Sequence, residues 1–242
     1  MRVKATVAYD GTDFVGFQRQ AVGRTVQGVF ESVLEDVVGS SVRVLAAGRT
    51  DAGVHAEGQV IAFDTEWRHS LSDLQRALNA CLPQDSVVRE LTQAAVDFHP
   101  RYDALSRRYR YTVYQAPVRS PLVRRASLHC KTPLDIEAMK AATTVIIGEH
   151  DFAAFGRPTK GDVTVRRVIE AHWSATPPWL VFEIEANAFL FRMVRSIVGT
   201  LLQVGHGKIS PERVLEILAS RDRSQAGKTA PAHGLCLIRV SY

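Results

Sequence analysis

The sequence has few cysteines and no long apolar segment, and each shortage excludes whole classes of protein. Its three cysteines, Cys81, Cys130 and Cys236, are odd in number and far apart, so they form neither a disulfide framework nor a zinc-ligand cluster. No run of about 18 apolar residues is present, and the first residues alternate like a strand instead of forming an apolar signal segment. We therefore expect a soluble, cytoplasmic protein with buried free thiols, no metal site and no membrane association.

The composition is that of an ordinary folded protein. Apolar residues make up 46% of the 242 residues and charged residues 23%, which excludes a disordered or fibrous chain. This length allows one large domain or two modest ones, each able to bury a core. A net charge of +5 with a pI near 9.3 is mildly basic, and by itself it points only weakly to an anionic partner.

Acidic residues are scarce in one part of the chain that is rich in arginine and tyrosine. Between residues 101 and 125 the only acid is Asp103. The strip contains Arg101, Arg107, Arg108, Arg110, Arg119, Arg124 and Arg125, interleaved with Tyr102, Tyr109, Tyr111 and Tyr114. Guanidinium groups and aromatic faces suit phosphates and unstacked bases, whereas the same arginines could simply keep an edge strand solvated. The sequence alone leaves both interpretations open.

The first half of the chain has the changes of period that are typical of a small α+β domain. Alternation over 3–7 predicts a strand. An apolar stripe over 26–37 predicts a helix that Thr25 caps and Gly39 ends. Further along we expect strands at 42–46, 59–63 and 87–91 and a helix at 71–82. The order β-α-β-β-α-β is that of a ferredoxin-like, split βαβ unit.

The second half repeats this pattern. We expect strands at 109–114, 163–173, 180–186 and 235–240, helices at 135–147 and 190–204, and a short extra helix from Ser210-Pro211-Glu212. Two tandem ferredoxin-like β-α-β-β-α-β units make an α+β fold, with one domain at 1–104 and a second at 105–242. A cleft between the two sheets is the natural place for a site.

A loop between two strands of the first half carries the strongest chemical signal. Gly48 and Gly53 bracket a single acid, Asp51, and a single arginine, Arg49, so the backbone can turn tightly and present both side chains at one point. A purely structural alternative is an Asx turn in which Asp51 bonds only its own backbone. Local chemistry alone does not exclude that alternative.

The loop resembles the motif that carries the nucleophilic aspartate in the tRNA pseudouridine synthase A family, and the likeness extends along the whole segment 48–60. Further blocks resemble that family in order and span essentially the full chain: Tyr9-Asp10-Gly11, Gly16-Phe17-Gln18-Arg19-Gln20, Asp97-Phe98-His99-Pro100-Arg101, Ser106-Arg107-Arg108-Tyr109-Arg110-Tyr111, Gly148-Glu149-His150-Asp151-Phe152, Phe191-Arg192-Met193-Val194-Arg195, and Ala230-Pro231-Ala232-His233-Gly234-Leu235. Two departures are visible: Phe17 stands where the family often has tryptophan, and Cys81 where it usually has an aliphatic residue.

The resemblance implies a pseudouridine synthase fold and an isomerase that acts on tRNA. Its substrates would be the uridines at positions 38, 39 and 40 of the anticodon stem-loop. The reaction breaks the N1–C1′ bond, turns the uracil and joins C5 to C1′, so no redox step, cofactor or metal is expected. Members of this family act as homodimers, and the resemblance implies the same here.

Two residues match the family's catalytic pair. Asp51 matches the nucleophile, which attacks C1′ of the sugar or C6 of the base; the sequence does not choose between these routes. Arg195 matches the arginine that pairs with the aspartate and keeps it ionised. As an alternative, Arg195 lies at the edge of an apolar helical stripe and could be a side chain that reaches the solvent along that edge.

Two further residues match the family's contacts to the target uridine. Tyr109 matches the tyrosine that lies against the base, although it could be an ordinary cross-strand aromatic. Arg49 matches the arginine that fills the space left by the flipped nucleotide, which costs a few kcal/mol to extrude. It could instead be a solvated loop charge.

Weaker candidates complete the site. We expect His55, Arg107 and Arg108 to take part in substrate binding, and Gln59, Arg19, Arg166 and Arg167 are weaker candidates still. His and Gln at such positions are more often structural. The arginines are expected only as phosphate contacts.

Two rival functions remain at this stage. Ferredoxin-like units also build non-catalytic RNA-binding modules, but such a module has no need of Asp51, Arg49 and Arg195 together. The same chemistry on another RNA is harder to separate from residue types alone. The full-length resemblance favours tRNA.

Overall fold

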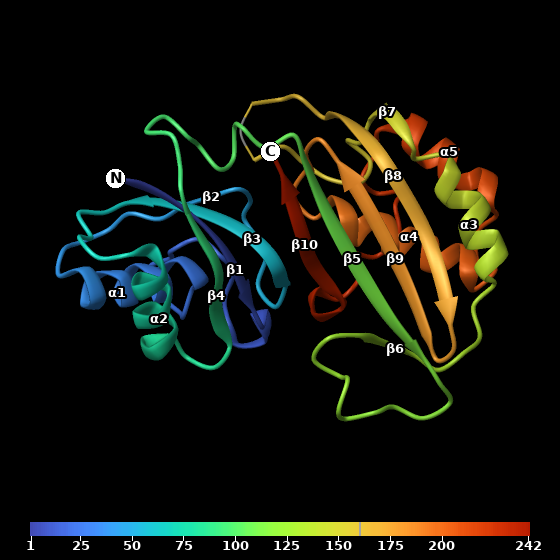
Figure 1. Ribbon diagram of the computed structural model, residues 1–242. Coiled ribbons are helices and arrows are strands. Elements are labelled where there is room, and N and C mark those ends of the chain that lie inside the picture. Colours follow the sequence, from blue (N-terminus) through green and yellow to red (C-terminus); the bar gives the residue numbers. More distant parts are fainter. Residues whose placement is uncertain (160) are drawn as a thin grey trace. The chain divides into compact units, whose positions relative to one another are not determined.

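A computed structural model describes residues 1–159 and 161–242 of the chain (Figure 1). These residues form two units, one of residues 1–105 with 236–242 and the other of residues 106–235. The expected second domain, 105–242, included the last strand. That strand, β10 (Leu235–Ser241), instead belongs almost entirely to the first unit, because it pairs in parallel with β3 (His55–Asp64) at Cys236 and His55.

The first unit contains the expected elements in the expected order. Strand β3 lies between β1 and β2 and is antiparallel to both, while β4 pairs antiparallel with the other edge of β1. A strand inserted between two parallel neighbours is the split βαβ arrangement, which confirms the ferredoxin-like prediction for this half. The elements are β1 (Arg2–Tyr9), the 3-10 turn η1 (Gly11–Asp13), α1 (Val26–Val38), β2 (Leu45–Ala46), β3, α2 (Leu71–Cys81) and β4 (Ser86–Gln93).

Local chemistry sets the helix ends of this unit. The Thr25 side chain accepts a hydrogen bond from the Gly28 N–H and begins α1, and Gly39 ends it in the left-handed conformation with φ 75°. Ser70 caps α2 in the same way. Leu74 and Leu78 on α2 are buried, as its apolar spacing predicts.

The second unit is an antiparallel sheet with its helices on one face (Figure 1). Its strand order is β5-β9-β8-β7, and the short β6 pairs in parallel with β5. The elements are β5 (Ser106–Gln115), β6 (Leu128–Cys130), α3 (Ile136–Thr144), β7 (Gly148–Asp151), β8 (Val165–Thr176), β9 (Trp179–Ala186), α4 (Met193–Gly205), α5 (Pro211–Ser220) and η2 (Ala232–Gly234). The predicted α+β class is confirmed for the described chain.

Several strand boundaries differ from the prediction because strand pairing sets where each strand begins and ends. Strand β3 begins at His55, not at residue 59, because β1 and β10 pair with its first residues. The predicted strand at 42–46 shortens to Leu45–Ala46, although Val42 and Val44 are buried. Strands β6 and β7 were not predicted, since segments of three and four residues carry too little alternation to be recognised.

Alternation along β5 separates two chemically different faces of the second unit. Tyr111 and Val113 are buried with Phe182 of β9 in the core. Arg108 and Arg110 point to the other face, opposite Glu185 and Glu183 of β9. Within residues 1–159 and 161–242, no helix combines the length and the apolar character needed to span a membrane.

Candidate active site

Asp51 lies in a tight turn between β2 and β3 of the first unit. Its backbone carbonyl accepts a hydrogen bond from the Val54 N–H at 3.1 Å, and its side chain is half-buried. Gly53 adopts φ 76°, in the left-handed region that favours glycine. The turn chemistry predicted for the two flanking glycines therefore holds at Gly53.

The segment after β1 fixes this turn from outside. The Phe17 N–H donates to the Thr50 carbonyl at 3.0 Å, and the Gly53 N–H donates to the Phe14 carbonyl at 3.3 Å. Gly16 has φ 119°, and a Cβ there would lie 3.1 Å from the Thr50 carbonyl oxygen. The block around Phe17 thus supports the loop, and its glycine is needed for the close approach.

A buried polar group fixes the turn from inside. The hydroxyls of Tyr9 and Thr50 are 2.8 Å apart, and both residues are buried. The fully buried Gln59 donates through Nε2 to the Gly48 carbonyl at 2.8 Å. Burial raises the pKa of Tyr9 to about 12, so its hydroxyl stays protonated and available as a donor. Asp51 is therefore presented by a loop whose backbone is held at several points.

Removing the Tyr9 hydroxyl tests this support. We expect Tyr9→Phe to lower the free energy of unfolding by about 1–2 kcal/mol, because the buried Thr50 hydroxyl loses its partner. Turnover should also fall, since the loop that carries Asp51 loosens. Chemical denaturation and steady-state kinetics measure the two effects. Tyr102→Phe, at an exposed position, is the matched control, and equal effects from both variants would contradict the supporting role.

His55 and Arg49 flank Asp51 in different environments. The His55 Nδ1 accepts a hydrogen bond from the Gly11 N–H at 3.0 Å and lies 3.1 Å from an Asp10 carboxylate oxygen. Nδ1 accepts from the Gly11 N–H in the tautomer that leaves it unprotonated, and it donates to Asp10 when it carries a proton. These contacts favour the structural alternative for His55. Arg49 is exposed, as a side chain that must reach a ligand has to be.

Arg195 lies in the first turn of α4, in the second unit. Its Nε donates to the Ala230 carbonyl at 2.7 Å, and the Ala230 N–H donates to the Arg195 carbonyl at 2.9 Å. The neighbouring Pro231 carbonyl accepts a hydrogen bond from the buried Tyr111 hydroxyl at 3.0 Å. Burial raises the pKa of Tyr111, so this donor also stays protonated. Because one edge of its guanidinium is fixed, Arg195 is not a freely moving rim side chain.

Tyr109 lies on β5 and is partly exposed. Its ring meets the Phe189 ring edge to face, with centroids 5.1 Å apart and planes at 88°. Edge-to-face packing fixes the orientation of an aromatic ring. Phe189 was not among the predicted site residues; its only signal is its place just before the Phe191–Arg195 block.

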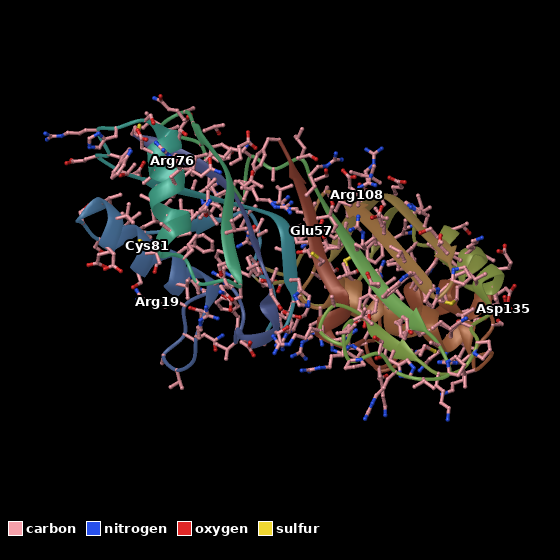
Figure 2. The ribbon with its side chains drawn as sticks, turned by 60° about the horizontal axis from the view of Figure 1, so that its bottom comes forward. Arg19, Glu57, Arg76, Cys81, Arg108 and Asp135 are labelled. Carbon is pink, nitrogen blue, oxygen red and sulfur yellow. The ribbon has the colours of Figure 1, made fainter. Side chains whose placement is uncertain are left out.

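The two arginines expected to bind phosphate with Tyr109 are engaged within the protein. The Arg107 Nη1 donates to the Asn187 carbonyl at 2.8 Å. Arg108, which Figure 2 labels, donates to Glu185 at 2.8 Å and pairs with Glu170 at 2.6 Å. The contacts with Glu185 and Glu170 raise the pKa of Arg108 above its ordinary value. The structure favours a structural role for Arg108, and its part in RNA binding stays a prediction.

The weaker candidates have mixed environments. Arg19 is exposed and lies 3.3 Å from Glu31. Arg166 donates to the carbonyls of Val163 and Val165, and burial lowers its pKa. Arg167 is exposed. Of these three, Arg166 is the least suited to meet a phosphate.

The predicted site residues divide between the units. Asp51, Arg49, His55 and Gln59 belong to the first unit, and Arg195, Tyr109, Arg107 and Arg108 belong to the second. The first group lies on the β2–β3 loop and β3, and the second on β5 and α4. The pairing of Asp51 with Arg195 and the cleft between the sheets stay predictions.

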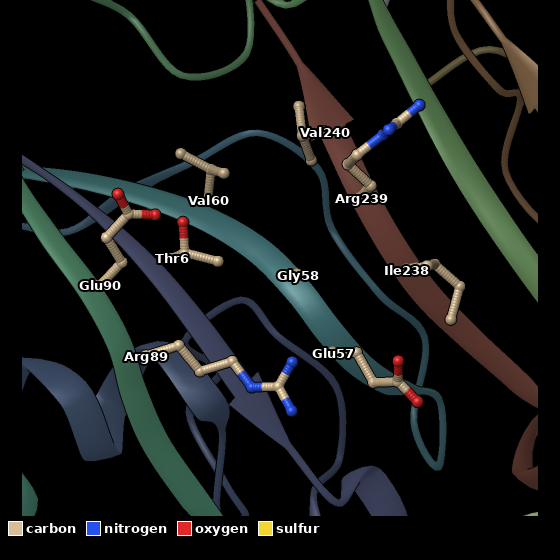
Figure 3. A pocket seen from close by; sticks show the side chains of 9 residues that line it. All are labelled: Thr6, Glu57, Gly58, Val60, Arg89, Glu90, Ile238, Arg239 and Val240. Carbon is tan, nitrogen blue, oxygen red and sulfur yellow. The ribbon is translucent and has the colours of Figure 1, made fainter.

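A pocket in the first unit contains none of these residues. It has a volume of about 430 Å³ and is lined by side chains of β1, β3, β4 and β10, which Figure 3 shows from close by. A Cβ on Gly58 would lie 2.2 Å from the Ile238 carbonyl oxygen, so this glycine lets β3 and β10 approach. Among the described residues, no three His, Cys, Asp or Glu side chains lie together in a way that could hold a metal ion.

The α+β fold and the half-buried Asp51 on its hydrogen-bonded loop define a candidate site for covalent catalysis, and comparisons with known proteins identify the class. A family model described as tRNA pseudouridine synthase matches residues 5–103 and 142–242. The chain belongs to the tRNA pseudouridine synthase family.

Relatives in this family match along almost the whole chain. A tRNA pseudouridine synthase A of Geotalea uraniireducens is 43% identical over 242 residues, which cover 100% of this chain and 99% of the relative. The protein of the same name from Moorella thermoacetica is 44% identical, with 99% of each chain covered. That of Halalkalibacterium halodurans is 46% identical, with 97% and 90% covered. The family assignment made from the sequence is confirmed.

Proposed function

We propose that this protein isomerises uridine to pseudouridine in tRNA, at positions 38, 39 and 40 of the anticodon stem-loop, with Asp51 as nucleophile. One observation carries the proposal. In a chain related over its full length to tRNA pseudouridine synthases, the Asp51 loop is held from both sides while the carboxylate itself is only half-buried. A nucleophile must be both fixed and reachable.

The reaction balances without an added reagent. The N1–C1′ bond breaks and the C5–C1′ bond forms, while C5 loses its proton and N1 gains one. Attack by the Asp51 carboxylate at C1′ or at C6 provides a covalent intermediate in either case. The balanced reaction requires no cofactor, and none is proposed.

The other residues take supporting roles in this proposal. Arg195, held by the Ala230 carbonyl, supplies the positive charge that keeps Asp51 ionised. Tyr109, oriented by Phe189, stacks on the flipped uracil. The catalytic loop belongs to the first unit, residues 1–105 with 236–242, and the tyrosine and arginine belong to the second, residues 106–235. We further propose that the protein is a cytoplasmic homodimer.

Product formation tests the proposal directly. The purified protein should release tritium from tRNA labelled at C5 of uridine, and mapping of the product should find pseudouridine at 38, 39 and 40. Tritium release with pseudouridine mapped at other positions would support the isomerase activity and contradict the proposed positions 38, 39 and 40. Binding to tRNA without any release would favour a non-catalytic RNA-binding module.

Replacing Arg49 distinguishes a role in base extrusion from a role in the chemical step. On folded tRNA we expect Arg49→Ala to lower kcat/KM by about ten- to a hundredfold, because the space left by the flipped nucleotide is no longer filled. On tRNA with a mismatch at the target pair the defect should shrink, since extrusion is cheaper there. Single-turnover rates on both substrates measure this difference, with Arg43→Ala as the control at another exposed position of the first unit. Equal losses of rate on both substrates would contradict the role in extrusion and indicate that Arg49 acts in the chemical step.

A further inference from the structure

We propose that the loop of residues 116–127, between β5 and β6, binds tRNA phosphates away from the target uridine. This inference rests on the proposed function, because it assumes that tRNA is the substrate. It assigns the RNA contact to a part of the arginine-rich strip different from the two arginines predicted for it. The observations that carry it are the charges, contacts and position of this loop within the second unit.

The part of the chain without acidic residues extends beyond the arginine-rich strip. Residues 104–134 contain no aspartate or glutamate at all. Their seven basic side chains are Arg107, Arg108, Arg110, Arg119, Arg124, Arg125 and Lys131. Folding places three of these arginines on β5 and three in the loop that follows it.

Carboxylates on neighbouring strands neutralise two of the three arginines on β5, Arg108 and Arg110. Arg110 donates to Glu183 at 2.9 Å, and Arg108 pairs with both Glu185 and Glu170. Glu183 and Glu185 are largely buried beneath these arginines. Arg108 and Arg110 therefore attract a polyanion weakly, and Arg107, the third arginine of β5, is engaged by the Asn187 carbonyl.

The loop has a different environment. Arg119 and Arg124 are exposed, and neither has a hydrogen bond or an ion pair within the part of the chain that the structure describes. Arg125 is also exposed. No acidic residue occurs anywhere in the loop. The positive charge of the strip is therefore concentrated here.

Hydrogen bonds give the loop a defined conformation. The Val123 carbonyl accepts from the Ala126 N–H at 3.1 Å and from the Ser127 hydroxyl at 2.8 Å. At its base, the Ala116 N–H donates to the Cys130 carbonyl at 3.1 Å. Arg124 thus projects from an ordered turn, so less conformational entropy is lost when it binds a ligand.

Position along β5 separates the loop from the proposed base contact. Tyr109 is near the start of β5, and the loop leaves the opposite end after Gln115, where Figure 1 shows it extending beyond β6. Six strand residues span about 20 Å. A stem of about five base pairs spans roughly 17 Å even at B-form spacing. We infer that the stem runs along β5, in which case the loop meets a part of the tRNA outside an isolated anticodon hairpin.

RNA phosphate is the partner that this chemistry favours. Guanidinium groups form paired hydrogen bonds with phosphate oxygens, and spaced arginines fit a regularly charged backbone. An acidic protein surface is the other polyanion that such a loop could bind. The proposed substrate supplies the first of these partners without a further assumption.

The test compares two substrates with the variant R119A/R124A. For full-length tRNA we expect Kd to rise about five- to twentyfold near 0.1 M salt, and the slope of log K against log salt to flatten by about two units. For a hairpin limited to the anticodon stem-loop, Kd should change less than twofold. The matched control R43A/R68A removes two exposed charges from the first unit and should leave the ratio between the substrates as in the wild type.

Three outcomes would overturn this assignment. Equal losses on both substrates would place the loop at the anticodon arm, and no loss on either would leave it as a solvated loop or a site for an acidic protein. A loss in the control of the same size would show only a general charge effect. Failure of the proposed function appears separately, as a wild-type protein that forms no pseudouridine on either substrate.

Discussion

Asp51→Asn should reduce pseudouridine formation to background while leaving tRNA affinity nearly unchanged. The amide keeps the volume and hydrogen-bonding shape of the carboxylate but is not a nucleophile, so we expect turnover to fall by about four orders of magnitude or more. Binding should tighten slightly if it changes, because a negative charge leaves a site that faces phosphates. Tritium release and filter binding on the same preparation measure both quantities.

The structure provides a control for this variant. Asp36→Asn makes the same chemical change on the exposed surface of α1 and should leave both turnover and affinity as in the wild type. The melting temperature should separate loss of chemistry from loss of the fold, since the loop is held chiefly through its backbone and Thr50. Product formation that survives in a folded Asp51→Asn protein would remove Asp51 as the nucleophile.

Replacing Arg195 should give the second largest loss. Arg195→Met removes the charge and the hydrogen bond to the Ala230 carbonyl, and we expect kcat to fall by about two to three orders of magnitude. Arg195→Lys retains the charge without the planar group that bonds Ala230, and it should recover only part of the rate. KM should change less than kcat in both variants, because the proposed role concerns the reacting groups.

Arg192→Met is the matched control for charge in the same region. Arg192 is exposed at the start of α4, and its guanidinium lies over the Phe191 ring at 4.9 Å. We expect it to affect kcat by less than threefold. If Arg195→Met lowered only stability, with kcat retained in the folded fraction, the residue would be a structural clamp for the segment at Ala230 and no more.

Much of the first unit could be predicted because its signals are local. The cap at Thr25, the left-handed Gly39 and the apolar stripe between them fix α1 without reference to the remainder of the chain. The turn at Gly53 likewise follows from its own backbone requirement. The start of β3 at His55 was missed because strand ends are decided by the neighbours that pair with them.

The site was predicted in part for the same reason. Asp51 and Arg49 occupy one continuous motif, so sequence alone could single them out. The support by Tyr9 joins residues 41 positions apart, and the packing of Tyr109 on Phe189 joins residues 80 positions apart. No periodicity records such contacts.

The sequence by itself determined the family, the α+β class and the loop that presents Asp51, since each rests on residues close together in the chain. Only the tertiary structure decided what the arginines do. Arg108 and Arg124 are indistinguishable in a basic strip, yet strand pairing brings Glu185 and Glu170 to Arg108, while the turn at Val123 leaves Arg124 exposed. A charge acts on whatever lies within a few ångströms, and folding selects those neighbours from distant parts of the chain.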